Sequence, residues 1–235
     1  MSRTVLDNRL RTAADLVRQG AYFADIGTDH AYLPVFLLEE GRVTRAYASD
    51  VARGPLAAAE AHIAASSVKD RILLRLADGL CGLFDCFPEV TDIAICGMGG
   101  ELIARLIDEA PLAKNPAIHL ILQPMTRAEV LRRYLAENGF SVKEERLSRA
   151  DGRIYTCMSV FFTGERYTLS PLAAYIGESL LSGERTELFF GYVKEKLSSL
   201  ETRINGLRAG GHDASADERF AKELRAILNE KEKSV

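Results

Sequence analysis

The 235-residue sequence lacks several features that define other classes of protein. It has no tryptophan and only four cysteines, none of them in a Cys-x-x-Cys pair (Cys81, Cys86, Cys96 and Cys157). This spacing argues against a zinc site or a disulfide framework, so we expect reduced thiols, no bound metal and a cytoplasmic protein. No apolar run approaches the roughly 20 residues that a membrane span requires, and the first seven residues lack the apolar core of a signal peptide.

A strong charge of either sign is also missing. The net charge is −3, and 30 Lys and Arg stand against 33 Asp and Glu. A global basic field of the kind that binds nucleic acid is therefore absent, although a local patch could serve. With 47% hydrophobic residues, the chain can form one domain of ordinary size with a buried core, plus an appendage.

The Gly-x-Gly-x-x-Gly fingerprint, which binds the pyrophosphate of dinucleotides, does not occur after the first strand. In its place stands Asp25-Ile-Gly-Thr-Asp-His30, between the apolar run 21–24 and the apolar stretch 31–38. The pattern predicts a strand, a tight turn and a helix. Gly27 lets the backbone approach a ligand closely. The turn therefore predicts a nucleoside cofactor without a pyrophosphate, and S-adenosylmethionine is the natural candidate.

Strand-like runs alternate with helical patterns up to about residue 163. We expect strands at 22–26, 45–49, 72–76, 92–96 and 118–122, and helices at 32–40, 55–65, 101–109 and 127–138. Such alternation predicts a parallel sheet with helices on both faces. Two more strands, 140–147 and 154–162, are joined by a turn-rich loop at 148–153 and should pair antiparallel. The layout is that of a Rossmann-like α/β class I methyltransferase with a seven-stranded, mostly parallel sheet, which we assign to residues 1–164.

Residues 165–235 have a different pattern and are expected to form a small helical domain. Ser170-Pro171 begins a helical region. A heptad seam follows, Gly210-Gly211 breaks it, and Ser215 to Glu218 reads as a capping box. The seam consists of Val193, Leu197, Leu200, Ile204 and Leu207. After the break, a second apolar stripe is formed by Phe220, Leu224 and Leu228. We predict an antiparallel coiled-coil-like hairpin, with packing of its first helix on the main domain as an equal alternative. The seam could also pair between chains, so we expect a monomer or a weak dimer.

Polar residues or glycines follow the strands at the edge where ligands bind in doubly wound sheets. Asp25 ends the first strand, and Asp50, about 25 residues further on, could accept hydrogen bonds from ribose hydroxyls. Asp78-Gly79 follows the third strand, where the carboxylate could accept from an adenine amino group. Cys96 to Gly100 and Gln123-Pro124-Met125 end the fourth and fifth strands. Each could be a helix cap or a plain turn, but their coincidence favours a cofactor site.

These motifs resemble a known family, the bacterial tRNA methyltransferases that modify N1 of adenine 22. The resemblance rests on Arg9-Leu10, Ala24 to Pro34, Asp50 to Pro55, Asp78 to Leu80, Cys96 to Gly100, Leu122 to Pro124 and Asp151 to Tyr155. It implies S-adenosylmethionine as methyl donor, tRNA as substrate, and a coiled-coil domain that helps to hold the tRNA. Met125 departs from the family pattern, in which many members have Asn, so no amide contact is carried over to that position.

The strand ends and the resemblance together give an expected site. The cofactor-binding set is Arg9, Asp25, Gly27, Thr28, His30, Asp50, Val51, Asp78, Gly79, Cys96, Gly97, Met98 and Gly99. The catalytic set is Asp29, Gly97, Met98, Gln123, Pro124 and Tyr155. We expect Gly97–Gly100 and Gln123-Pro124 to shape the adenine slot, Tyr155 or Tyr32 to stack on the base, and Asp29 to stabilise the cationic product. His30, at a helix start, could bind the methionine carboxylate.

Basic residues after the fifth strand and in the hairpin form the expected tRNA surface, with a solvated surface as the alternative. They are Arg127, Arg132, Arg133, Lys143, Arg146, Arg149 and Arg153. Other functions also stay open. They are an NAD-dependent oxidoreductase, a methyltransferase of another RNA, a protein or a small molecule, and a non-catalytic RNA-binding protein on a methyltransferase fold.

Overall fold

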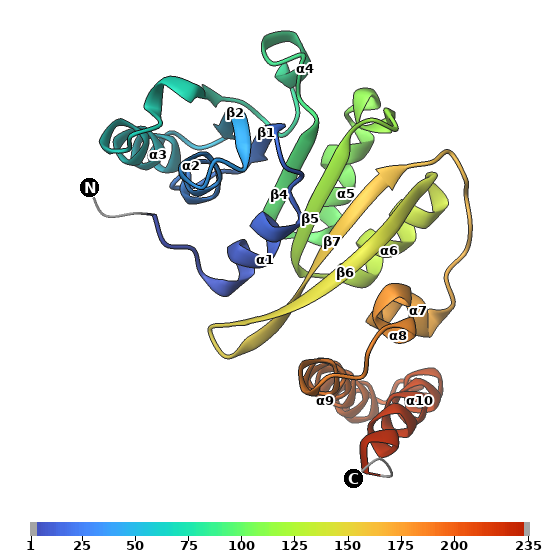
Figure 1. Ribbon diagram of the computed structural model, residues 1–235. Coiled ribbons are helices and arrows are strands. Elements are labelled where there is room, and N and C mark those ends of the chain that lie inside the picture. Colours follow the sequence, from blue (N-terminus) through green and yellow to red (C-terminus); the bar gives the residue numbers. More distant parts are fainter. Residues whose placement is uncertain (1–3, 233–235) are drawn as a thin grey trace.

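The structure, a computed structural model, describes residues 4–232 and is built around one seven-stranded sheet (Figure 1). The strand order is β3-β2-β1-β4-β5-β7-β6. The strands are β1 (Ala21–Ile26), β2 (Val43–Asp50), β3 (Ile72–Leu76), β4 (Asp92–Gly99), β5 (His119–Thr126), β6 (Phe140–Ala150) and β7 (Arg153–Phe162). The first five strands are parallel, and β7 pairs antiparallel with both β5 and β6. The predicted Rossmann-like methyltransferase fold is confirmed.

Helices cover both faces of the sheet. They are α1 (Asn8–Leu16), α2 (Tyr32–Glu39), α3 (Arg53–Ala65), α4 (Leu83–Cys86), α5 (Gly100–Asp108) and α6 (Ala128–Glu137). Two short 3-10 helices, Lys69–Arg71 and Pro111–Lys114, complete this part. Ile93 and Ile95 pack on the face of α4, α5 and α6, whereas Ala94 packs on the face of α1, α2 and α3. Successive strand residues point to opposite faces, so these apolar strands have a core on each side.

The hairpin at the end of the sheet is tighter than predicted. The turn-rich loop expected at 148–153 is wrong, because β6 continues to Ala150 and β7 begins at Arg153. Only Asp151-Gly152 forms the turn, and both residues have positive φ, 47° and 74°. Asp-Gly is a preferred pair for such a two-residue turn. The hairpin strands are correspondingly long, and they extend past the sheet toward the C-terminal helices (Figure 1).

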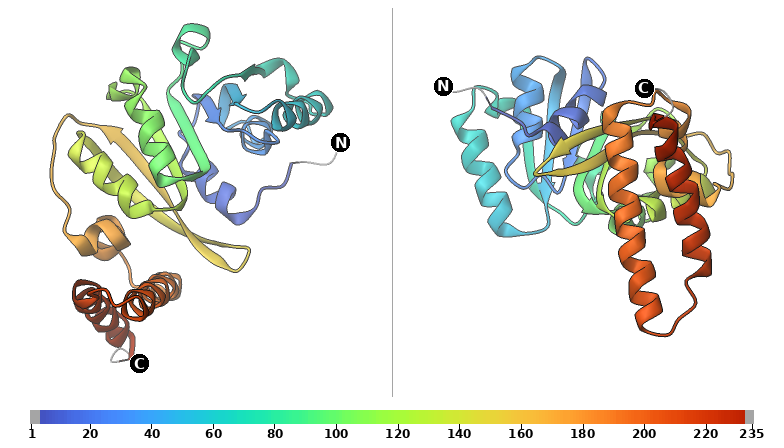
Figure 2. Two further views of the ribbon diagram at one scale, coloured as in Figure 1. Left: turned by 180° about the vertical axis from the view of Figure 1, so that it is seen from behind. Right: turned by 90° about the horizontal axis from the view of Figure 1, so that it is seen from below.

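The C-terminal part contains α7 (Pro171–Ile176), α8 (Glu178–Ser182), α9 (Glu187–Ala209) and α10 (Ser215–Glu232). Helices α9 and α10 lie side by side as a hairpin that projects beyond the sheet (Figure 2). Val193, Leu197, Leu200 and Ile204 of the predicted seam are buried, and they share a cluster with Leu224 of α10. The same cluster includes Ile154 of β7, so α9 packs on both α10 and the sheet. None of the described helices is long and apolar enough to cross a membrane.

The capping box expected at Ser215 to Glu218 is wrong. The side chain that accepts hydrogen bonds at the start of α10 is Asp213, from the Ser215 amide at 2.9 Å and the Ser215 hydroxyl at 3.0 Å. These hydrogen bonds, led by the one from the backbone amide, lower the pKa of Asp213. The cap therefore lies two residues before the position that the sequence pattern indicated.

Arg132 is buried, which corrects its expected place on a tRNA-binding surface. Only 1% of the residue is exposed. Its Nη2 lies 2.7 Å from Glu145 Oε2, and its Nε donates to the same carboxylate at 3.0 Å. Nη1 donates to the carbonyls of Ala174 and Tyr175, and Nη2 contacts Tyr192 Oη at 3.4 Å. A guanidinium can be buried when its donors are paired in this way. Arg132 therefore joins α6 and β6 to α7 and α9.

Candidate active site

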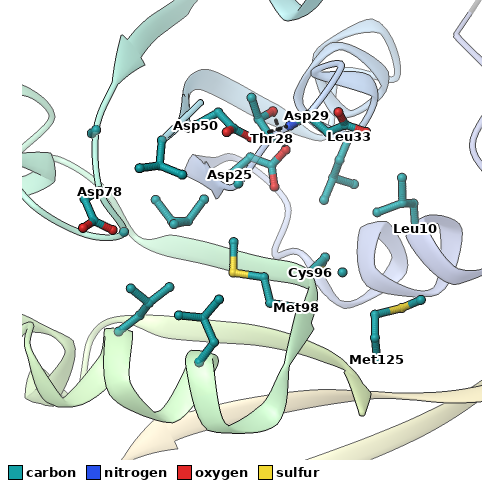
Figure 3. Close-up of a pocket in the computed structure, with 18 of the residues that line it drawn as sticks. Leu10, Asp25, Thr28, Asp29, Leu33, Asp50, Asp78, Cys96, Met98 and Met125 are labelled. Carbon is teal, nitrogen blue, oxygen red and sulfur yellow. Dashed lines mark hydrogen bonds between the residues drawn. The ribbon is translucent and has the colours of Figure 1, made fainter. Parts of the chain in front are cut away.

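A cleft of about 690 Å³ opens at the carboxyl ends of the parallel strands (Figure 3). The volume falls in the range of roughly 300 to 1,000 Å³ that is usual for small-molecule sites. The cleft lies where β1 and β4 are neighbours, and the chain runs outward from this pair to β2 and β3 on one side and to β5 on the other. Ligands bind at such a switch point in doubly wound sheets. In Figure 3, Asp78 lies at one end of the cleft and Leu10 and Met125 lie at the other.

The turn after β1 forms one wall of the cleft. The amides of Gly27 and Thr28 both donate to Ser49 O, at 2.9 and 2.8 Å, which ties the turn to β2. Gly27 has φ +72°, and a Cβ at this position would collide with Met98 Cε. A side chain at Gly27 would therefore be strained and would also fill the cleft. Met98, expected in the site, reaches this wall from β4.

Asp25 is the buried carboxylate of the site, with only 4% of the residue exposed. Burial raises its pKa to about 6, and the nearby charge of Asp50 also raises it. The Thr28 hydroxyl, which donates to Asp25 Oδ2 at 2.7 Å, and Arg9 oppose this rise. A carboxylate in this environment is stabilised in its charged form by a cation that enters the cleft. No backbone amide at the start of α2 donates to Asp25, so the capping interpretation does not apply to it.

Asp50 lines the cleft and also accepts hydrogen bonds from two backbone amides. Its Oδ1 accepts from the Ala52 amide at 2.9 Å, and its Oδ2 accepts from the Asp29 amide at 3.3 Å. Each carboxylate oxygen can accept more than one hydrogen bond, so acceptor capacity remains for a ligand. Val51, next in the chain, is 68% exposed and belongs to the rim.

Asp78 and Gly79 line the far end of the cleft. The Asp78 side chain is exposed, and its backbone carbonyl accepts from the Cys81 amide at 3.1 Å. Gly79 has φ +56°, and a Cβ there would collide with Leu106 of α5. The turn and the site therefore depend on the same glycine, and Asp78 keeps its carboxylate available to a ligand.

Gln123 organises the end of β4. Its Oε1 accepts from Arg9 Nη1 at 2.8 Å and from the Gly97 amide at 3.1 Å. Gln123 is fully buried and does not line the cleft, whereas Arg9, Cys96, Gly97 and Met98 do. Gln123 thus fixes two groups that face the cleft and joins α1 to β4 and β5.

The glycines of Gly97-Met-Gly-Gly100 have different roles. Gly97 has φ +79° and faces the cleft. A Cβ at Gly100 would collide with the backbone carbonyl of Arg127, so Gly100 allows α5 to approach the turn before α6. Gly99 lies outside the cleft lining, paired with Thr126 of β5. The interpretation as a plain turn therefore fits Gly100, whereas Gly97 fits the interpretation as part of a ligand site.

Other expected residues lie at or outside the rim. Asp29 lines the cleft with φ 52° and a side chain that is 69% exposed. His30 does not line the cleft. Its ring stacks on Tyr32, with centroids 5.3 Å apart, and Tyr32 does line the cleft. Pro124 and the buried Tyr155 line a second, smaller cleft, and Met125 borders both clefts.

Comparison with known proteins places this chain in a family. A methyltransferase domain family matches residues 6–158. The tRNA (adenine(22)-N(1))-methyltransferase of Bacillus subtilis (strain 168) is 33% identical over 183 residues, which cover 78% of this chain and 74% of that protein. The chain belongs to the tRNA (adenine-22, N1)-methyltransferase family.

Solved structures of this family agree over nearly the whole chain. A Streptococcus pneumoniae protein, provisionally assigned as a tRNA (m1A22) methyltransferase and crystallised with S-adenosyl-L-methionine, is 32% identical. It matches with a TM-score of 0.83 over 95% of this chain and all of that chain. The Bacillus subtilis m1A22 tRNA methyltransferase is 26% identical, with a TM-score of 0.76 over 97% of each chain. The likeness extends beyond the methyltransferase domain, because this coverage includes the C-terminal helices.

Sequence reasoning missed part of the cleft. Leu102, Arg105 and Leu106 of α5 line it, although they were not expected there. They follow the glycine-rich end of β4 at the i, i+3, i+4 spacing that places residues on one face of a helix. Their position could have been found from this spacing. Leu10, Ile26, Leu33, Ala77 and Met125 also line the cleft and were not in the expected set, although Leu10, Ile26 and Leu33 lie within the motifs Arg9-Leu10 and Ala24 to Pro34. Within residues 4–232, no group of three or more His, Cys, Asp or Glu could hold a metal ion.

Proposed function

We propose that this chain is an S-adenosylmethionine-dependent methyltransferase that acts on N1 of adenine 22 in tRNA. The observation that carries the proposal is the cleft, in which Asp25, Asp50 and Asp78 stand at three successive strand ends of a methyltransferase fold. Membership in the family supports the substrate and the atom that is modified.

The residues of the cleft fit S-adenosylmethionine. Asp50 has acceptors for the ribose hydroxyls, and Asp78 has an acceptor for the adenine amino group. The buried Asp25 suits the ammonium of the methionine end, and Arg9 suits its carboxylate. Gly27 and Gly97 have positive φ, and neither places a side chain beside the ligand. When bound, the cofactor supplies a sulfonium methyl that is already activated for transfer.

The chain need not supply a strong base, because adenine N1 carries an in-plane lone pair. Its work is to hold the base in line with the methyl group and to exclude water. We propose that Gly97, Pro124 and Met125 border the adenine slot, and that Tyr32 or Tyr155 stacks on the base. Gln123 acts by fixing Gly97 and Arg9. In a folded tRNA the N1 edge must first be freed, by flipping the base out of its stack.

The substrate class can be tested with labelled S-adenosylmethionine and three acceptors in parallel. These are unmodified tRNA transcripts, a structured RNA of similar length that is not a tRNA, and a mixture of proteins. We expect label only in the tRNA. Label in another acceptor would support one of the alternative substrates, and label in none would support the non-catalytic RNA-binding alternative.

Asp29 is expected to stabilise the positive charge that develops on the adenine ring. Asp29→Asn is the suitable change, because Asn also tolerates the positive φ of this position. We expect kcat to fall about tenfold, while the Kd for S-adenosylmethionine stays within about twofold of the wild-type value. Asp151→Asn is the matched control, since Asp151 also has positive φ but forms the hairpin turn. An equal loss of turnover and cofactor affinity would contradict this role.

Cofactor binding should depend on pH through Asp25. Its pKa of about 6 means that its ionised fraction falls from about 0.9 at pH 7 to about 0.1 at pH 5. The ammonium of the cofactor interacts with the ionised form, so we expect its affinity to fall about tenfold across this interval. Calorimetry at both pH values measures the change, and Asp25→Asn should remove it. An unchanged pH dependence in Asp25→Asn would contradict the assignment.

Asp25 should also make the stability of the cofactor-free protein depend on pH, but stability falls with rising pH whereas cofactor affinity rises. The folded-state pKa of Asp25 is raised above the ordinary value of 3.8, so the folded state holds the proton more tightly. Its contribution to stability is therefore lost as pH rises from about 4 to about 6, by at most about 3 kcal/mol. Urea denaturation of the wild type and of Asp25→Asn across this window measures the difference.

We further propose that residues 1–164 are the catalytic domain and that residues 165–235 form a helical domain that contacts tRNA. We expect the protein to be cytoplasmic, where tRNA is available, and to be a monomer or a weak dimer. Helix α9 uses most of its apolar seam within the chain, against α10 and β7, which favours the monomer.

A further inference from the structure

The second cleft lies at the junction of the sheet with the C-terminal helices. Pro124, Met125 and Tyr155 line it from the sheet, and Tyr192 and Lys196 line it from α9. Met125 also lines the large cleft, so the two clefts lie beside each other with Met125 bordering both. The volume of this second cleft is about 50 Å³, far below the roughly 300 Å³ at which small-molecule sites begin. It can therefore hold a single polar group beside the larger site, but not a whole base.

Lys196 and Arg127 supply the positive charge of this cleft within the described residues. Arg127 is neutralised by two carboxylates, Glu101 and Glu129, each at 3.2 Å. The ammonium of Lys196 instead lies over two aromatic rings, Tyr175 at 5.0 Å and Tyr192 at 5.4 Å. Within residues 4–232, no carboxylate is paired with it. Lys196 is thus a charge that is held in place but not neutralised.

The position of Lys196 is fixed by the buried contacts described above. Tyr192 lies one helical turn before it, is 3% exposed and contacts Arg132 Nη2 through its hydroxyl. The hydroxyl of Tyr175 donates to the Lys196 carbonyl at 3.1 Å. Arg132 also donates to the Tyr175 carbonyl. The network around Arg132 therefore holds α9 so that Lys196 faces Pro124 and Met125.

We propose that Lys196 is a positioning residue that binds a backbone phosphate of the tRNA beside the nucleotide whose base enters the active site. The inference rests on the proposed function, because it takes tRNA as the substrate. A flipped base carries its phosphates to the mouth of the site. Lysine is a compact point charge that suits a phosphate, and such contacts set the register of a nucleic acid on a protein. The C-terminal helices thereby contribute directly to placing adenine N1.

Lys196→Met tests the charge, because methionine keeps an unbranched side chain but removes the ammonium that lies over Tyr175 and Tyr192. Lys196→Arg keeps the charge, and Lys194→Met removes an exposed charge two residues away on α9. The readout is the salt dependence of tRNA affinity between 50 and 200 mM salt, together with the KM for tRNA. The logarithm of affinity falls linearly with the logarithm of salt concentration, and each lost phosphate contact makes this slope shallower by about 0.7 to 0.9.

We expect Lys196→Met to make the slope shallower by about 0.7 to 0.9, the value of one phosphate contact, and to raise the KM for tRNA roughly tenfold. Its Kd for S-adenosylmethionine should stay at the wild-type value. Lys196→Arg should restore both tRNA values, and Lys194→Met should change neither. A wild-type slope in Lys196→Met, or no restoration by arginine, would overturn the role of Lys196 while leaving methylation intact. A wild-type protein that methylates no tRNA would instead overturn the proposed function, and this inference with it.

Discussion

Arg132→Ala should lower the free energy of unfolding by about 3–5 kcal/mol. Arg132 and Glu145 have side chains that are each 1% exposed. Removal of the guanidinium leaves the Glu145 carboxylate buried with only neutral donors such as the Thr156 hydroxyl, at 2.8 Å. It also leaves the carbonyls of Ala174 and Tyr175 without this donor. A buried charge that loses its partner is costly because water cannot replace it.

Urea denaturation followed by circular dichroism measures the loss. Arg203→Ala is the matched control, because Arg203 pairs with Asp217 at 2.6 Å between α9 and α10 but is 56% exposed. We expect that control to cost less than about 1 kcal/mol. A loss that small in Arg132→Ala would show that the buried contacts of Arg132 contribute little to joining α6 and β6 to α7 and α9. The double change Arg132→Met with Glu145→Met should recover much of the stability, because it removes both buried charges.

Asp50→Ala should weaken S-adenosylmethionine binding at least about 100-fold. The change removes the acceptors proposed for two ribose hydroxyls, and hydrogen bonds to a charged group contribute roughly 1.5–3 kcal/mol each. Calorimetry measures the Kd, and thermal denaturation of the free protein measures the accompanying structural cost. That cost should be about 1 kcal/mol, because the Ala52 and Asp29 amides lose an acceptor at a solvent-accessible turn.

Asp70→Ala is a suitable control for Asp50→Ala. Asp70 is an exposed acid in the short helix before β3, outside the cleft. We expect the Asp70→Ala variant to bind S-adenosylmethionine with the wild-type Kd. A change in Kd of less than about threefold in Asp50→Ala would show that this carboxylate serves only the turn.

The fold and the three acidic positions could be predicted because they follow from local patterns. Strand and helix periodicities are read over short windows, and parallel topology brings all strand ends to one edge of the sheet. Asp25, Asp50 and Asp78 therefore line the same cleft, as expected. The roles proposed for them stay predictions until binding is measured.

What could not be predicted depends on contacts between distant residues. Arg9 and Gln123 are 114 positions apart, and no spacing indicates that they share a hydrogen bond. Arg132 stands among surface-like charges in the sequence, but it lies on the face of α6 that holds Leu131 and Leu135, where Glu145 neutralises it. An Arg132→Glu variant would thus report on folding and not on tRNA contact. Arg133, its exposed neighbour, is the residue to change in a test of that surface.

The most direct test of the central claim is methyl transfer to a pair of tRNA transcripts that differ only at position 22. One transcript carries adenine there and the other carries guanine, and both receive labelled S-adenosylmethionine. We expect label in the adenine transcript alone, recovered after digestion as 1-methyladenosine. Equal label in both transcripts, or label recovered as a different nucleoside, would contradict the assignment of adenine 22 and its N1 atom.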